Sequence, residues 1–139
     1  MTTKMEKSKL AVKESTSRSC KEGVLAALEE PAVMLSKSLT RRCMSLVPTL
    51  KDGVPNILER PHIEQLNRAL ASVGANMVEG VGRATNTDKL RFFRTARGSA
   101  YEAVYWAQLL EVPFTIDTIT LANLLDNKIL EEIAQHTPD

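Results

Sequence analysis

The residues best suited to chemistry in this sequence are the cations that lie between positions 83 and 97. Five basic side chains stand in this stretch against the single acid Asp88. Guanidinium groups pair with phosphate oxygens in fixed geometry, so the stretch could bind nucleic acid. One helix face is predicted to carry four side chains spaced by three and four residues: Arg94, Arg97, Tyr101 and Tyr105. The tyrosine rings on this face could stack on bases.

The same face could instead form an interface between subunits, because Arg and Tyr are enriched there too. Residues 100–139 carry seven acids against Lys128, so they could attract the arginines of a neighbouring subunit. The two interpretations can coexist, and both stay open. The predicted nucleic-acid-binding residues are Lys89, Arg91, Arg94 and Arg97, with Arg83, Arg41 and Arg42 as lesser candidates, whereas Tyr101 and Tyr105 are predicted to stack on bases or to lie in an interface.

The glycines just before this stretch do not indicate a nucleotide cradle. The segment "EGVGRATNT" lacks the preceding strand of a dinucleotide site and the Lys-Ser/Thr ending of a P-loop. Gly80 and Gly82 instead predict the end of one helix. Thr85 and Asp88 predict a capping box at the start of the next, in which each side chain accepts a hydrogen bond from the backbone N–H of the other.

Neither a catalytic nor a metal site is predicted. The two histidines, His62 and His136, are far apart, and 22 residues without a nearby histidine separate Cys20 from Cys43. A di-iron site would need two Glu-x-x-His pairs, and the sequence has only one, from Glu59 to His62. Potential serine nucleophiles have no base at hand. The sequence therefore predicts a protein that is not an enzyme and has no metal or cofactor.

Glu79 is the one carboxylate that invites a catalytic interpretation, with Asn76 one turn before it. We interpret it instead as a buried, ion-paired residue that fixes how the helices align. The expected partner is Arg83, Arg91 or Arg94.

These side chains must be positioned by helices. The chain has 139 residues, enough for one domain, and a net charge of +1 that by itself indicates no partner. Aromatic residues make up 4%, so the core must come from aliphatic side chains and Ala. Apolar residues recur at steps of three and four in four segments. The predicted inward residues are Val24, Leu28, Ala32, Leu35, Leu39, Cys43 and Leu46; Ile63, Leu66, Leu70, Val73 and Met77; Phe93, Ala96, Ala100, Ala103, Ala107 and Leu110; and Leu121, Leu124, Leu125, Ile129 and Ile133.

Prolines and caps set the expected helix boundaries. Pro31 either separates two helices or kinks one long helix. Pro48 is expected to end the first segment, Pro61 to open the second and Pro113 to end the third. Asp117 is expected to cap the fourth. Short connections predict an all-α fold, an up-and-down antiparallel four-helix bundle over residues 19–137, preceded by a flexible basic segment over residues 1–18. No apolar run could span a bilayer and no secretory signal is present, so we expect a protein of the reducing cytoplasm.

The stretch "RALASVGANMVEGVGRATNTDKLRFFRTARGSAYEAVYWAQLL" resembles the core of small bacterial four-helix-bundle proteins first noted as open reading frames within 23S rRNA intervening sequences. Gly74 stands where that family usually has proline, Asp88 where glutamate is common and Lys89 where an aromatic residue is common. The residues at the matching places are Arg68, Ala69, Ser72, Asn76, Glu79, Gly80, Gly82, Arg83, Thr85, Arg91, Phe92, Arg94, Gly98 and Ser99.

The resemblance implies ring-like homopentamers of four-helix bundles. One branch of the family is the accessory variability determinant of diversity-generating retroelements, which binds a reverse transcriptase and nucleic acid through a basic surface. The leading hypothesis is therefore a non-enzymatic homo-oligomeric scaffold that binds RNA or DNA and accompanies a reverse transcriptase. The alternative is a purely structural or protein-interaction bundle whose arginines form the subunit interface.

Overall fold

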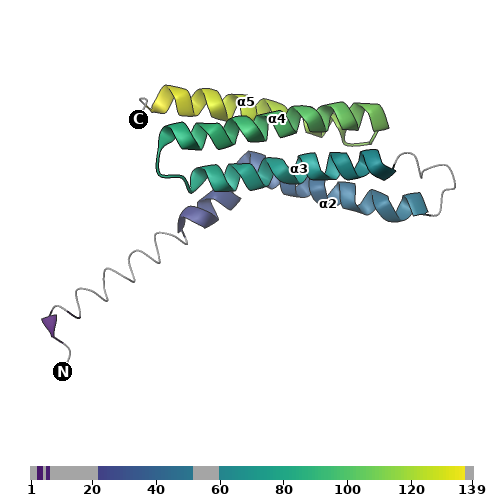
Figure 1. The fold of residues 1–139 in the computed structure, drawn as a ribbon. Helices are drawn as coiled ribbons and strands as arrows, with labels where there is room; N and C mark the ends of the chain where they lie inside the picture. Colours follow the sequence, from purple (N-terminus) through teal and green to yellow (C-terminus); the bar gives the residue numbers. More distant parts are fainter. Residues whose placement is uncertain (1–2, 5, 7–21, 52–59, 137–139) are drawn as a thin grey trace.

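The protein is all-helical in the part of the chain that the structure describes, a computed structural model covering residues 3–4, 6, 22–51 and 60–136. Four long helices lie side by side (Figure 1): α2 (Pro31–Lys51), α3 (Arg60–Val81), α4 (Asn86–Leu110) and α5 (Thr115–Gln135). A shorter helix over residues 22–28 precedes α2. The all-α prediction is confirmed, since these ranges contain no strand. Apart from residues 3, 4 and 6, the predicted flexible segment 1–18 lies outside the described residues.

Each long helix packs against two others, α2 and α4 each against both α3 and α5. Neighbouring helices run in opposite directions. In α2 and α3, for example, the hydroxyl of Ser36 bonds the backbone near Gly74, while the Cys43 thiol lies 3.8 Å from the carbonyl oxygen of Ile63. No helix among the described residues is long and apolar enough to cross a bilayer.

The core comes from aliphatic and alanine side chains, as the composition predicts. Every residue predicted to face inward from α3 is buried, and in α4 and α5 the predicted pattern holds apart from the positions below. Leu35, Leu46, Leu110 and Leu124 are only partly buried against this core. The buried residues that match the predicted stripes are Ala32, Leu39, Cys43, Ile63, Leu66, Leu70, Val73, Met77, Phe93, Ala96, Ala100, Ala103, Ala107, Leu121, Leu125 and Ile129.

Three predicted core residues are wrong, because they lie on the surface. Val24 and Leu28 are 49% and 37% exposed, since the helix over residues 22–28 turns Ala27 inward instead. Ile133 is 49% exposed, and Glu132 takes the inward position beside it. Glu132 can do so because its carboxylate lies 3.3 Å from the Lys128 ammonium, which also meets Glu30 at 3.3 Å. Burial of the Lys128 ammonium favours its neutral form, but the two carboxylates outweigh this and raise its pKa.

The helix boundaries settle the alternatives left by the prolines. Pro31 is the first residue of α2 and separates it from the helix over residues 22–28, so it does not kink one long helix. Pro48 does not end α2, which continues to Lys51, since a proline in the last turn removes only one backbone hydrogen bond. Helix α3 begins at Arg60, one residue before Pro61, and α4 ends before Pro113 as expected.

Asp117 is not the cap of α5, contrary to the prediction. The N-cap is Phe114, which makes no side-chain cap, and the helix begins at Thr115. The chain reverses earlier than expected because Glu111 adopts a left-handed conformation with φ 52°. Asp117 therefore falls in the first turn, where it accepts a hydrogen bond from Arg42 of α2 at 2.8 Å.

Gly80, at the end of α3, is required for its small size rather than for a left-handed turn. The helix does end at Val81 as predicted, but neither Gly80 nor Gly82 has positive φ. A Cβ at Gly80 would lie 2.8 Å from Cε1 of Phe93 and 3.0 Å from Cβ of Phe92. Since Phe93 is fully buried, its ring cannot move aside. Gly80 is what allows α4 to approach α3 at this end.

Replacing Gly80 by Ala should destabilise the fold by about 1–3 kcal/mol, because the added methyl group overpacks a filled site. Chemical denaturation followed by circular dichroism measures the change. The matched control is Gly98→Ala in the exposed middle of α4, where a Cβ meets nothing within 4 Å. That variant should be stabilised by up to about 1 kcal/mol through helix propensity. Equal effects of the two substitutions would contradict the close-approach explanation.

Candidate nucleic-acid interface

The turn from α3 into α4 gathers two of the predicted cations around one aromatic ring. The guanidinium carbons of Arg83 and Arg91 lie 4.4 and 4.5 Å from the ring centroid of Phe92. Asp88 bridges them: its Oδ1 accepts from Nε and Nη2 of Arg91 at 2.9 and 2.7 Å, and its Oδ2 lies 3.6 Å from Nε of Arg83. Exposed cation–π contacts contribute about 0.5–1 kcal/mol each. These two arginines therefore help to hold the turn, and Asp88 balances part of their charge.

One half of the predicted capping box is present. The Thr85 hydroxyl accepts a hydrogen bond from the backbone N–H of Asp88 at 3.1 Å, which caps α4. Among the hydrogen bonds of the described residues, the reciprocal bond from the Thr85 N–H to the Asp88 carboxylate does not occur. The carboxylate faces Arg91 and Arg83 instead, because charged donors compete better for it than a neutral amide.

Glu79 pairs with one of its predicted partners but is not buried. Its Oε1 accepts from Nη2 of Arg83 at 2.5 Å, one turn along the chain. The Glu79 side chain is 53% exposed, so the predicted buried carboxylate is a surface ion pair. Exposed pairs of this kind are worth at most about 1 kcal/mol.

Arg97 and Tyr101 form a clamp between α4 and α5. Nε of Arg97 donates to Oδ1 of Asp126, and the Tyr101 hydroxyl donates to Oδ2 of Asp126 at 2.7 Å. Nη2 of Arg97 also donates to the Tyr101 hydroxyl at 3.2 Å, with the guanidinium 4.8 Å from the ring centroid. The hydrogen bond from Tyr101, aided by Arg97, outweighs the effect of burial and lowers the pKa of Asp126. Arg97 thus meets an acid of its own chain.

Tyr105, predicted to share that face, joins an aromatic group at the far end of α4. Its ring meets Trp106 edge-on, with centroids 5.0 Å apart, and Trp106 stacks on His62 of α3 at 5.4 Å. The indole N–H donates to Oε1 of Glu102 at 3.1 Å. The Trp106–His62 contact could not be predicted from the sequence, because the two residues lie on different helices and no spacing rule links them.

Lys89 and Arg94 are the α4 cations that keep their charge available. Neither has an ion-pair partner in the described ranges, and Arg94 is exposed. Both lie near the start of α4, where Arg91 and Arg94 line a shallow hollow together with Asp88. Glu79 and Asp126, from α3 and α5, join Asp88 among the five cations of residues 83–97. The local charge is therefore nearer +2 than the +4 of that sequence stretch.

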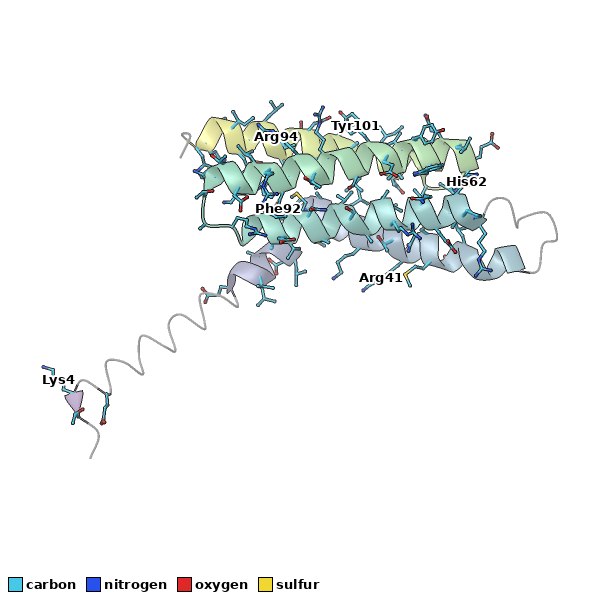
Figure 2. The ribbon with its side chains drawn as sticks, in the orientation of Figure 1. Lys4, Arg41, His62, Phe92, Arg94 and Tyr101 are labelled. Carbon is cyan, nitrogen blue, oxygen red and sulfur yellow. The ribbon has the colours of Figure 1, made fainter. Side chains whose placement is uncertain are left out.

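The lesser candidates Arg41 and Arg42 are not part of this surface. They lie on α2, and Figure 2 shows Arg41 and Arg94 on opposite sides of the helices. Arg42 donates to Asp117 of α5 and lies 5.0 Å from the ring centroid of Phe114. Arg41 is exposed and has no ion-pair partner in the described part of the chain. A single continuous contact with one subunit cannot include both groups unless the ligand wraps around the molecule.

The remaining polar groups form structural contacts. Ser72 and Ser99 meet across α3 and α4 with their Oγ atoms 2.9 Å apart, and Asn76 Nδ2 donates to Oγ of Ser72 at 3.0 Å. No histidine or carboxylate takes part in this contact. Within the described ranges, no group of three or more His, Cys, Asp or Glu side chains could hold a metal ion. Cys43 is buried, and burial raises the pKa of its thiol to about 11.

The chain is thus a small all-α protein in its described part, with arginines gathered near the start of α4. The family model described as 23S rRNA-intervening sequence protein matches residues 35–135. This range includes α3, α4 and α5 completely and most of α2. The chain therefore belongs to the 23S rRNA-intervening sequence protein family, and the resemblance seen in the sequence is confirmed at the level of the family. No curated protein and no solved structure matches the chain.

The clamp predicts a specific pKa change. Replacing Tyr101 by Phe removes the leading cause of the shift, so the pKa of Asp126 should rise toward its ordinary value of 3.8. Since the folded-state pKa is lowered, the stabilisation by this carboxylate is full above the unfolded value and is lost as the pH falls through the folded value. Carboxyl carbon NMR titration measures the shift. Tyr105→Phe is the control and should leave Asp126 unchanged; an unchanged pKa in Tyr101→Phe would refute the clamp.

The burial of the Cys43 thiol predicts that it reacts slowly with thiol reagents. In a Cys20→Ser variant, Cys43 should react with a disulfide reagent at pH 8 at least a hundredfold more slowly in the native state than in denaturant. A pKa of about 11 leaves little thiolate at that pH, and burial blocks access. Rapid native reaction, followed by absorbance, would show that α2 opens readily from α3.

Proposed function

We propose that this protein is a non-enzymatic, homo-oligomeric scaffold that binds RNA or DNA through the start of α4. The observation that carries the proposal is the pair Lys89 and Arg94, cations without an ion-pair partner among the described residues, beside the exposed Arg91. Phosphate binding needs cations that are not already neutralised. Membership of a family named after 23S rRNA intervening sequences supports RNA as the nucleic acid.

The bound surface would be small in a single subunit. Two unpaired cations and a partly balanced Arg91 can neutralise only a few phosphates. Repetition of the surface around an oligomer would multiply these contacts and raise the avidity. We therefore propose that the four long helices act as an up-and-down antiparallel four-helix bundle that assembles into a ring-like homo-oligomer, a pentamer by family resemblance.

A narrower role is accessory factor to a reverse transcriptase in a diversity-generating retroelement, acting in the cytoplasm. Its support is the sequence resemblance to the family that includes this branch, together with the basic start of α4. Pairing with acids of the same chain favours the second candidate in its purely structural form, a bundle that binds no nucleic acid; the paired residues are Arg42, Arg83, Arg91 and Arg97.

Salt-dependent RNA binding tests the proposal. Fluorescence anisotropy with a labelled single-stranded RNA should give a log–log salt slope of about −0.7 per phosphate neutralised. Replacing Lys89 and Arg94 by Ala together should make this slope shallower by about 1.4. No binding by the wild type at low salt would refute the nucleic-acid function.

Each control variant removes one positive charge at a position other than Lys89 and Arg94. Arg60 lies at the start of α3 with its Nε 3.7 Å from Oε1 of Glu64. Arg60→Ala should leave the salt slope unchanged. Arg97→Ala should weaken binding less than Arg94→Ala, because Asp126 already balances Arg97. An effect of Arg97→Ala equal to that of Arg94→Ala would mean that the intramolecular ion pair opens on binding.

A further inference from the structure

An apolar groove with basic side chains at its edge lies between α2 and α3. Its volume is about 540 Å³, and its apolar lining includes Val33 of α2, Ala71, Ala75 and Val78 of α3, and Leu28 of the preceding helix. Three charged side chains also line it: Lys37, Arg41 and Glu79. Glu79 is paired with Arg83, whereas neither cation has an ion-pair partner within the described ranges. Helix α2 as a whole carries four basic residues and no acid. The groove therefore suits an apolar helix face flanked by a carboxylate.

A helix face of that kind exists on the same chain and has no partner there. Helix α5 exposes Ile116, Ile119, Leu130 and Ile133, with exposed fractions of 77%, 40%, 66% and 49%. Their spacings of three, eleven and three residues place them on one side of the helix, because eleven residues make about three full turns. We refer to these four residues as the α5 ridge. Exposed apolar surface arranged along one helix face indicates an interaction site.

The charges around the α5 ridge complement those of the groove. Helix α5 carries four acids against Lys128. Asp117, Asp126 and Glu132 are already paired within the chain. Glu131 is exposed next to Leu130 and has no ion-pair partner in the described part of the chain. A subunit thus presents an unpaired acid beside the α5 ridge and two unpaired cations beside the groove.

We propose that the α5 ridge of one copy of this chain docks into the α2–α3 groove of a second copy, with Glu131 facing Lys37 and Arg41. The inference rests on the proposed homo-oligomer and names the surfaces that would build it. Because the two surfaces differ and lie on different helices, the contact is head to tail. Such a contact closes into a ring when the rotation between copies allows it, unlike a self-complementary two-fold dimer.

Two single substitutions separate the partners of this contact. Ala75→Glu places a carboxylate in the groove, and Leu130→Glu places one on the α5 ridge; both positions are exposed, so each chain should fold. Light scattering coupled to size exclusion should show an oligomer for the wild type and a monomer for each variant. Ala71→Glu is a second groove variant if Ala75→Glu does not fold. Met44→Glu, at a 58% exposed position outside the groove, is the control and should keep the oligomer.

Mixing the two variants gives the decisive result. Equal amounts of Ala75→Glu and Leu130→Glu retain one intact groove and one intact α5 ridge, so they should form a one-to-one dimer. A monomeric wild type, an intact oligomer in either variant, dissociation by Met44→Glu, or no dimer on mixing would each overturn the proposal. RNA binding by the monomeric variants is measured separately, so the nucleic-acid function can fail without the interface failing, and the reverse.

Discussion

The close approach of α3 and α4 is the constraint on which the other features depend. Gly80 leaves room for the Phe93 ring, and the alanines of α4 let the rest of the two helices meet. Ser72 of α3 and Ser99 of α4 also meet across this contact, through their hydroxyl groups. This geometry keeps the turn between α3 and α4 short, so that Arg83 in the turn lies close to Asp88 and Phe92 of α4. The same small residues that look uninformative in composition thus decide where the conspicuous charged residues lie.

The charge of this surface depends on helices that are distant in sequence. A count along residues 83–97 includes Asp88 but neither Glu79 nor Asp126, which α3 and α5 bring to the same place. Short-range counting therefore overstates how basic the region is. The structure also separates residues that were grouped together from the sequence, since Arg41 lies across the molecule from Arg94 (Figure 2) and Arg42 pairs with Asp117 of α5. What remains is a smaller set of available cations than the sequence stretch indicates.

Local patterns predicted most of the fold because helices obey local rules. The inward stripes of α3 and α4 and the Thr85 cap follow from spacing and backbone chemistry within a few residues. Failures occurred where charge pairing or a turn conformation, neither of which apolar spacing reports, decided the outcome. Glu132 is inward because of Lys128, Asp117 meets Arg42 rather than capping α5, and the left-handed turn at Glu111 moves the start of α5. The pairing of Arg97 with Asp126 could not be read from spacing for the same reason.

The hydroxyl of Ser36 has a mechanical consequence for the groove between α2 and α3. It donates to the carbonyl oxygen of Leu70 at 2.6 Å and accepts from the N–H of Gly74 at 3.0 Å, and it is fully buried. A proline at position 74, which is usual in the family, could not supply that N–H. Axial slip of α2 along α3 would leave a buried hydroxyl without partners, at a cost of about 1–3 kcal/mol. The groove walls are thus held against slip before anything docks, and this preorganisation lowers the entropy lost on association.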